Sequence, residues 1–280
     1  MAALRESGRS LIAILAAALI CWSHAAAAAD DNLYHAQAVV TGQLEPNRLL
    51  GFGACLEDVL IKVSGQPDLA GDDRLPPYKA KAKEFVSSFS YHDQFAGKPH
   101  RDEQGTRDRP YDLTVNFDAK QVDGILGELK LKPWLSHRPV LGVFVEMQQG
   151  AKDFIVTSDG TKSDLQRDAL ATAAGKRGMQ VVLPAAAALA AANAREIELL
   201  TMPPATLASI ASALGGEAVL VGRLVWDDND LGWTTRYQMS WRGKDYSWQF
   251  RGVTFDEAFV RGIGGAAQIL SGNGDPTHAK

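Results

Sequence analysis

Three arginines and two glutamines near the C-terminal end have the types and spacing that suggest chemistry. In Gly232–Trp241 and Tyr246–Val253 aromatic and polar residues alternate, so each predicted strand has one buried face and one polar face. Guanidinium groups attract carboxylates and phosphates, and side-chain amides add further hydrogen bonds. We therefore predict a polar recognition face on this sheet. It consists of Arg223, Arg236, Gln238, Gln249 and Arg251.

The connecting loops predict the register of the three strands. Loop 227–232 places Arg223 opposite Arg236, and loop 242–245 places Arg236 opposite Arg251. Like charges directly opposite each other, on strands about 5 Å apart, are unfavourable. Long side chains can splay the charged groups apart. Otherwise the row needs anions, either carboxylates of this chain or an acidic group on a partner.

The same register places Gly222, Tyr237 and Phe250 in one row of the aromatic face, where the missing side chain makes room for two rings. Three tryptophans share this face, so we interpret them as core residues. Stacking against a glycan is the alternative interpretation. These residues are Trp233, Trp241 and Trp248.

Other residue patterns do not indicate catalysis, and we predict no catalytic residue, no metal site and no cofactor. The sequence has no nucleophile elbow, Walker loop, HExxH or CxxC. Asp227, Asp228 and Asp230 form a solvated acidic turn in our interpretation, with Ca²⁺ binding as the alternative. Cys55 lies on an apolar helical stripe, which favours a buried, inert thiol over a catalytic one.

Residues 1–29 have the pattern of a signal peptide. Arg5 and Arg9 precede the apolar run Leu11–Ile20, and residues 25–29 are all alanine. The apolar run is too short to span a bilayer, so we expect cleavage, export to a bacterial periplasm and no membrane span afterwards. Removing this segment, which has a net charge of +1, takes the formal charge from −4 to about −5. That acidic balance argues against nucleic acid or an anionic membrane surface as the main partner.

The remaining chain is predicted to have an α+β fold with two small domains. Each domain has a mixed or antiparallel sheet with helices packed on it, and a three-strand meander closed by a helix ends the second. We place the N-terminal domain at 30–131, a proline-containing linker at 132–139, the C-terminal domain at 140–271 and a loose tail at 272–280.

Periodicity and capping residues define the expected elements within these domains. Expected strands are 33–41, 90–95, 111–117, 140–147, 154–157, 179–183, 218–226, 232–241 and 246–253. Expected helices are 46–64, 76–89, 118–129, 163–178, 184–194, 203–214 and 254–270, with capping boxes at the starts of the fourth and the last.

Several separate motifs occur along the chain in a fixed order. They are Leu33–Tyr34, Ala54–Gly65, Phe89–Tyr91, Leu113–Phe117, Pro133–Trp134, Arg138–Pro139, Ala218–Leu224 and Trp248. With these motifs the chain resembles, over residues 33–270, the bacterial family called domain of unknown function 2066. That family name implies no activity and no site residues. Residues 140–270 are more distantly similar to the N-terminal domain of TolB and to related envelope-protein domains that bind other proteins, through Gly215–Leu224 and the two strands after it.

The function that agrees best with these features is a non-catalytic interaction or adaptor protein of the cell envelope. Its expected partner is another envelope protein. One alternative is a glycan- or peptidoglycan-binding module, and another is an envelope hydrolase of unspecified type. A hydrolase would need an activated nucleophile or a pair of carboxylates in a cleft, and no residue pattern indicates either.

Overall fold

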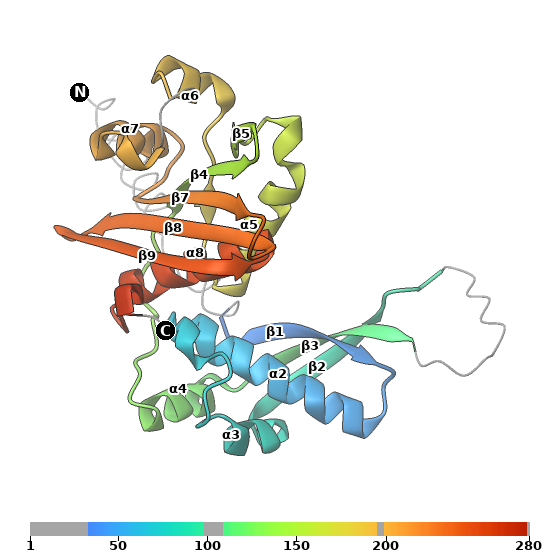
Figure 1. Cartoon of the computed structure of the whole chain (residues 1–280). Helices are drawn as coiled ribbons and strands as arrows, with labels where there is room; N and C mark the ends of the chain where they lie inside the picture. The colour runs from blue at the N-terminus through green and yellow to red at the C-terminus, as the bar shows by residue number, and fades with distance from the viewer. Residues whose placement is uncertain (1–32, 98–108, 195–198, 279–280) are drawn as a thin grey trace, which may run out of the picture.

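The computed structural model describes residues 33–97, 109–194 and 199–278. These residues form two sheets with helices packed on them, which confirms the α+β fold class (Figure 1). One sheet has three strands in the order β1-β3-β2, and the other has the order β5-β4-β7-β8-β9 with β6 paired to β4. The predicted signal peptide and most of the segment between the expected strands 90–95 and 111–117 lie outside the described residues.

The bounds of the elements agree with most of the expected spans. The strands are β1 (His35–Thr41), β2 (Val86–Asp93), β3 (Pro110–Phe117), β4 (Leu141–Gln149), β5 (Lys152–Ile155), β6 (Val181–Val182), β7 (Ala218–Asp227), β8 (Gly232–Trp241) and β9 (Lys244–Val253). The α-helices are α2 (Glu45–Ser64), α3 (Pro76–Ala80), α4 (Ala119–Glu128), α5 (Asp164–Lys176), α6 (Ala186–Ala191), α7 (Pro204–Ala213) and α8 (Phe255–Ser271). Short 3-10 helices are η1 (Pro67–Leu69), η2 (Ala82–Phe85), η3 (Thr161–Ser163), η4 (Leu199–Thr201) and η5 (Pro276–His278).

Helix α2 packs on one face of the three-stranded sheet. Its stripe of Phe52, Leu56 and Leu60 is buried against the strands, as amphipathic spacing predicts. Gly65 ends the helix in the left-handed conformation at φ 70°, and its N–H donates to the Ile61 carbonyl at 2.8 Å. The start and the end of this helix were therefore readable from the sequence.

The predicted helix 76–89 is wrong beyond its first turn. Helix α3 ends at Ala80, a 3-10 turn follows, and Val86 begins strand β2. The residues after Val86 alternate serine with aromatic side chains, and they pair with β3 rather than continuing a helix. Cross-strand pairing of aromatic residues outweighs a helical spacing that only a few apolar residues support.

The other face of the three-stranded sheet is open, and its polar side chains bond to one another. Gln37 Nε2 donates to Thr114 Oγ1 at 3.3 Å, and Asn116 Nδ2 donates to Ser88 Oγ at 2.9 Å. At the far end of the face, Asp112 accepts from Gln94 Nε2 at 2.7 Å. This face therefore satisfies many of its hydrogen bonds internally.

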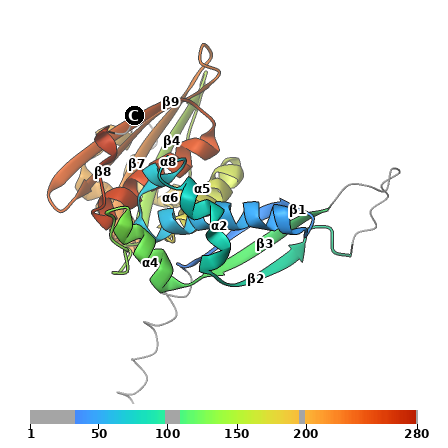
Figure 2. The same cartoon turned by 90° about the horizontal axis from the view of Figure 1, so that it is seen from below.

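The larger sheet is covered on one side and only partly covered on the other. Helices α5 and α8 pack on the side that carries the aromatic residues of β8 and β9 (Figures 1 and 2). On the opposite side, a separate apolar cluster joins α6, η4 and α7 to Phe144 of β4 and Val221 of β7. No helix in the described part of the chain shares an apolar cluster with that side of β8 and β9.

Glycines let large rings fill the core beneath α8. Tyr237 stacks on Trp248 with ring centroids 5.8 Å apart. A Cβ at Gly262 would lie 2.5 Å from the Tyr237 ring, and one at Gly265 would lie 2.7 Å from Trp248. The predicted row of Gly222, Tyr237 and Phe250 is correct for the first pair and wrong for the second. Gly222 pairs with Tyr237, but Tyr237 pairs with Trp248 instead of Phe250.

The segment between the two sheets is anchored through Trp134 and Arg138, although Lys132 and residues 135–137 are exposed. Trp134 is buried, and its backbone N–H donates to the Val63 carbonyl at 2.7 Å. Arg138 lies over the Trp134 ring at 4.2 Å and donates to the carbonyls of Lys62 and Arg177 at 2.9 and 2.7 Å. Burial lowers the pKa of the Arg138 guanidinium to about 10, so the group stays charged at neutral pH.

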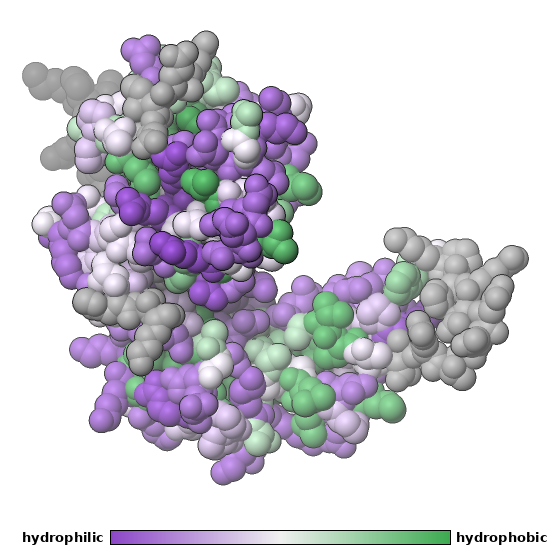
Figure 3. All heavy atoms as spheres, viewed as in Figure 1, coloured by the Kyte–Doolittle hydropathy of each residue, from purple (hydrophilic) through white to green (hydrophobic). Residues whose placement is uncertain are grey.

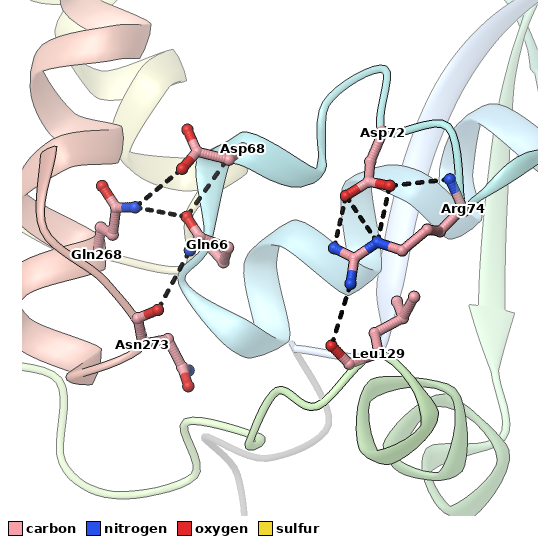
Figure 4. Close-up of polar contacts among 7 residues, drawn as sticks. All are labelled: Gln66, Asp68, Asp72, Arg74, Leu129, Gln268 and Asn273. Atoms are coloured by element: carbon pink, nitrogen blue, oxygen red, sulfur yellow. Dashed lines mark hydrogen bonds and ion pairs between the residues drawn. The ribbon is translucent and has the colours of Figure 1, made fainter. Parts of the chain in front are cut away.

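Residues 272–278, which the sequence predicted to be loose, are held against both parts of the chain (Figure 4). Gln268 of α8 donates to Gln66 Oε1 at 2.7 Å and to Asp68 Oδ2 at 3.1 Å, and Gln66 in turn donates to the Asn273 carbonyl at 3.2 Å. Asn273 also donates to the Lys132 carbonyl at 2.9 Å. Hydrogen bonds to backbone carbonyls order this tail although its composition is polar.

Candidate functional site

The predicted recognition face lies on the side of β7, β8 and β9 opposite α8, and α7 and η4 cover its part at Val221 of β7. Glu146 of β4 pairs with Arg223 of β7, and Arg223 pairs with Arg236 of β8. Gln249 of β9 completes the row beside Arg236. The predicted Arg223–Arg236 pair is confirmed, and it places two guanidinium stems side by side on this face.

The predicted pairing of Arg236 with Arg251 is wrong, because Gln249 occupies that position. The prediction assumed a four-residue loop, whereas Trp241 pairs with Lys244 across a two-residue turn. The two turn residues, Arg242 and Gly243, have φ values of 50° and 78°. Positive φ at both positions is typical of the type I′ hairpin turn, which matches the twist of the strands.

Because the register error is two residues, it moves no side chain to the other face. Arg251 lies two residues beyond Gln249 on the same strand and is exposed. The pairing of β8 with β9 shifts between Trp233 and Thr235, and Gly252 has a φ of 67° beside this irregularity. Arg251 therefore lies at the bulged end of the face, away from the Arg236 row.

Arg223 has its charge offset within the chain. Its Nε lies 3.9 Å from Glu146 Oε1, and one terminal nitrogen donates to Gln148 Oε1 at 3.0 Å. The side chains of Arg223 and Glu146 are only 22% and 12% exposed, so water screens this pair weakly. Sequence reasoning missed Glu146. Its carboxylate lies within the apolar run Leu141–Met147, and a charged group in such a run needs a partner, so a signal was present.

The rest of the face differs from Arg223. Arg236, Gln249 and Arg251 are exposed and Gln238 is half-buried. Among the described residues, none of these four side chains has a hydrogen bond or an ion pair. Figure 3 shows hydrophilic residues gathered over this part of the molecule, with apolar residues beside them. Binding groups are therefore available here without breaking contacts within the described chain.

Two hollows adjoin the row. The first, called the apolar pocket below, has a volume of about 230 Å³ and lies between α7, η4 and the sheet; its walls include Leu199, Met202, Leu207, Ala208, Val219 and Val221, with Gln238 at one side. The second, called the polar hollow, has a volume of about 390 Å³ and lies between β8, β9 and η5. Its walls are Arg236, Ser247, Trp248, Gln249, Pro276 and Thr277.

Among the described residues that line the apolar pocket, one has a carboxylate, and that carboxylate is already bound. Glu217 Oε2 lies 2.8 Å from His137 Nε2, and Glu217 Oε1 accepts from the Val140 N–H at 3.3 Å. The hydrogen bond from His137, followed by that from Val140, lowers the pKa of the Glu217 carboxyl below its usual value. Glu217 is therefore ionised at neutral pH and held at the rim rather than aimed at a ligand.

The remaining sequence candidates occupy ordinary structural positions. Cys55 is fully buried, and burial raises the pKa of its thiol to about 12. Asp227 accepts from the Asn229 N–H at 2.8 Å, which closes the acidic turn on itself. In the ranges that the structure describes, no group of three or more His, Cys, Asp or Glu side chains is arranged to hold a metal ion. Within the same ranges, no helix has the length and apolar character needed to cross a membrane.

Fold and site together define a two-sheet α+β protein with an open cationic face on its larger sheet. A model of the family described as Domain of unknown function (DUF8605) matches residues 27–135. The match covers the three-stranded sheet and its helices, and the candidate face lies outside it. The resemblances to the domain 2066 family and to TolB have no support from this comparison, and no curated protein matches the chain.

Proposed function

We propose that the chain is an exported, non-catalytic interaction protein of the cell envelope that binds an acidic partner through the open face of its larger sheet. The observation that supports this most is the difference between two paired arginines. Arg223 has Glu146 beside it, whereas Arg236 is exposed and has no counter-ion among the described residues. A guanidinium group with free donors binds carboxylates in a fixed, directional geometry.

Export and an envelope partner rest on the sequence. The basic, apolar and alanine-only succession in residues 5–29 is typical of a secretory signal, and the distant resemblance of residues 140–270 to protein-binding envelope domains agrees with this role. Glycan binding by the aromatic face has less support, because Trp233 and Trp248 are only 8% and 4% exposed and pack in the core. A protein partner on the polar face is therefore the preferred function.

The proposal is tested by site-specific photocrosslinking in living cells. A photoreactive phenylalanine replaces Gln249 on the candidate face, and in a matched control it replaces Ser90 on the open face of the smaller sheet. We expect one major crosslinked protein from position 249 and none from position 90. The variant Arg236→Gln should lose the crosslink at position 249, because it removes the charge without changing the strand.

Fractionation of the same cells tests export. We expect the crosslinked chain in the periplasmic fraction, shortened by cleavage between residues 25 and 31. Equal crosslinking from positions 249 and 90, or a crosslink that survives Arg236→Gln, would contradict the proposed face. A chain that retains Met1 and stays in the cytoplasm would contradict the envelope role.

A further inference from the structure

The apolar pocket and the polar hollow are neighbours on one sheet face. Gln238 lines the apolar pocket and Arg236 lines the polar hollow, two positions apart on β8. Side chains two positions apart on a strand point to the same side and lie about 7 Å from each other. Gln238 also pairs with Ser247, which lines the polar hollow. A single ligand can therefore occupy both hollows.

The volume of the apolar pocket limits what enters it. At about 230 Å³ it is larger than a cavity that holds benzene, which is about 150 Å³. It is smaller than the roughly 300–1,000 Å³ of pockets that enclose drug-sized molecules. One aromatic or branched aliphatic side chain therefore suits it better than a long acyl chain.

The polar hollow selects for a negative charge. Among the described residues that line it, Arg236 carries the only charge, and Ser247, Gln249 and Thr277 add neutral polar groups. The nearest acidic residue in sequence, Asp275, is held by Lys244 Nζ at 2.7 Å. A carboxylate entering the hollow meets a guanidinium group that no described carboxylate neutralises.

Between the two hollows lies a side chain that suits a peptide backbone. The Gln238 amide has both a donor and an acceptor, and no described residue bonds to either. A peptide in extended conformation presents an N–H and a C=O at each residue, and its alternate side chains point the same way at about 7 Å spacing. That spacing matches the separation along β8 of Gln238, which lines the apolar pocket, and Arg236, which lines the polar hollow.

We infer that this face binds one extended acidic segment of a partner protein. A large apolar side chain of the segment enters the apolar pocket, the Gln238 amide bonds its backbone, and Arg236 binds the carboxylate of an Asp or Glu two positions away. This inference rests on the proposed function, and it adds the sequence pattern of the bound segment.

The test selects phage-displayed random peptides on the immobilised full chain. We expect enriched peptides to carry a large apolar residue two positions from an Asp or Glu. A synthetic copy of the most enriched peptide is then titrated by fluorescence anisotropy against the full chain and its variants. The peptide itself is varied in parallel, with Ala at the apolar position or with Gln or Asn at the acidic one.

Three variants distinguish the two contacts. Ala208→Phe fills the apolar pocket from an exposed position on α7, and Ala205→Phe is its control, exposed on the same helix but outside the pocket. Arg236→Gln removes the charge. We expect Ala208→Phe and Arg236→Gln each to weaken binding roughly 10- to 100-fold, the range set by burial of one large side chain or by one charge-assisted hydrogen bond. Ala205→Phe should change affinity less than twofold, and thermal unfolding should show all three variants folded.

The outcomes separate the inference from the proposed function. If Arg236→Gln abolishes binding while Ala208→Phe leaves it unchanged, the cationic face stands as the binding site for an acidic partner and the two-point segment is refuted. If neither Arg236→Gln nor Ala208→Phe weakens binding, both the inference and the proposed function are contradicted. Failure to enrich the spaced pattern, or saturable binding of laurate or anionic phospholipid vesicles that Ala208→Phe blocks, also overturns the inference, because the ligand would then not be a peptide.

Discussion

The two open sheet faces of this molecule both contain side-chain amides, but these amides differ in whether they form hydrogen bonds within the chain. On the smaller sheet, Gln37 bonds to Thr114 and Asn116 bonds to Ser88. On the larger sheet, Gln238 and Gln249 have no partner among the described residues. A face whose groups already bond to each other must break those bonds to bind a ligand, whereas unpartnered groups exchange only water. Polarity alone therefore does not identify a binding face.

The first prediction concerns the side of the larger sheet that provides its stability. Trp248 is 4% exposed and stacks on Tyr237. Trp248→Ala should lower the free energy of unfolding by about 3–5 kcal/mol, because it leaves a large cavity against α8. Urea denaturation measures this loss. Arg236→Gln is the matched comparison on the open side of the sheet and should change stability by less than about 0.5 kcal/mol. A large loss from Arg236→Gln would show that the face is structural.

The second prediction changes Glu146, the counter-ion of Arg223. Glu146→Gln removes the negative charge 3.9 Å from Arg223. We expect stability to fall by about 1 kcal/mol and affinity for an acidic peptide to rise several-fold, because the face gains one positive charge. Glu84→Gln makes the same charge change at an exposed site beside the smaller sheet and should change neither the stability nor the affinity. Weaker binding by Glu146→Gln would contradict the electrostatic basis of the site.

The third prediction concerns the self-paired face. Asn116→Ala removes the donor to Ser88 Oγ, which lies at 2.9 Å. An exposed neutral hydrogen bond contributes little, so we expect a loss of about 0.5 kcal/mol in unfolding free energy and unchanged affinity for an acidic peptide. Denaturation and anisotropy titration of the same preparation measure both. A change in affinity as large as that from Arg236→Gln would remove the distinction between the faces.

The fourth and smallest effect is a pH dependence at the polar hollow. Lys244 is the main cause that lowers the pKa of the Asp275 carboxyl to about 2. Because the folded pKa lies below the ordinary value of 3.8 for an aspartate, the stabilisation is present above about pH 4 and is lost as pH falls toward 2. Hydrogen exchange should show residues 272–278 opening first over that range. In Lys244→Met this opening should already occur at higher pH, and an unchanged profile would show that the pair does not hold the tail.

Much of the fold was predictable where local patterns and tertiary packing agree. The Thr254 hydroxyl accepts from the Glu257 N–H at 3.2 Å, as the capping box predicts. The second capping box is wrong, because Ser163 Oγ accepts from the Thr157 N–H at 3.3 Å and does not cap α5. The Thr157 N–H, in the loop after β5, takes the place of the helix N–H as the donor to that hydroxyl. Thr157 lies near Ser163 because β5 returns along β4, and residue spacing in the sequence does not reveal this return.

The candidate face was predictable only in part, for reasons of sequence distance. Alternation in Gly232–Trp241 and Tyr246–Val253 identified the correct sides of the strands, since a two-residue shift preserves them. The counter-ion Glu146 pairs with Arg223 through parallel strands that are far apart in the chain. The two-residue turn was missed because a non-glycine residue with positive φ, here Arg242, is uncommon.

The most direct test compares both faces in one sample by NMR. The full chain, labelled with ¹⁵N, is titrated with the selected acidic peptide while the side-chain resonances are followed. We predict that the Arg236 Nε–H and the amides of Gln238 and Gln249 shift together with one saturation curve, and that the amides of Gln37 and Asn116 stay unchanged. Shifts confined to Gln37 and Asn116, or equal shifts on both faces, would contradict the assignment of binding to the larger sheet.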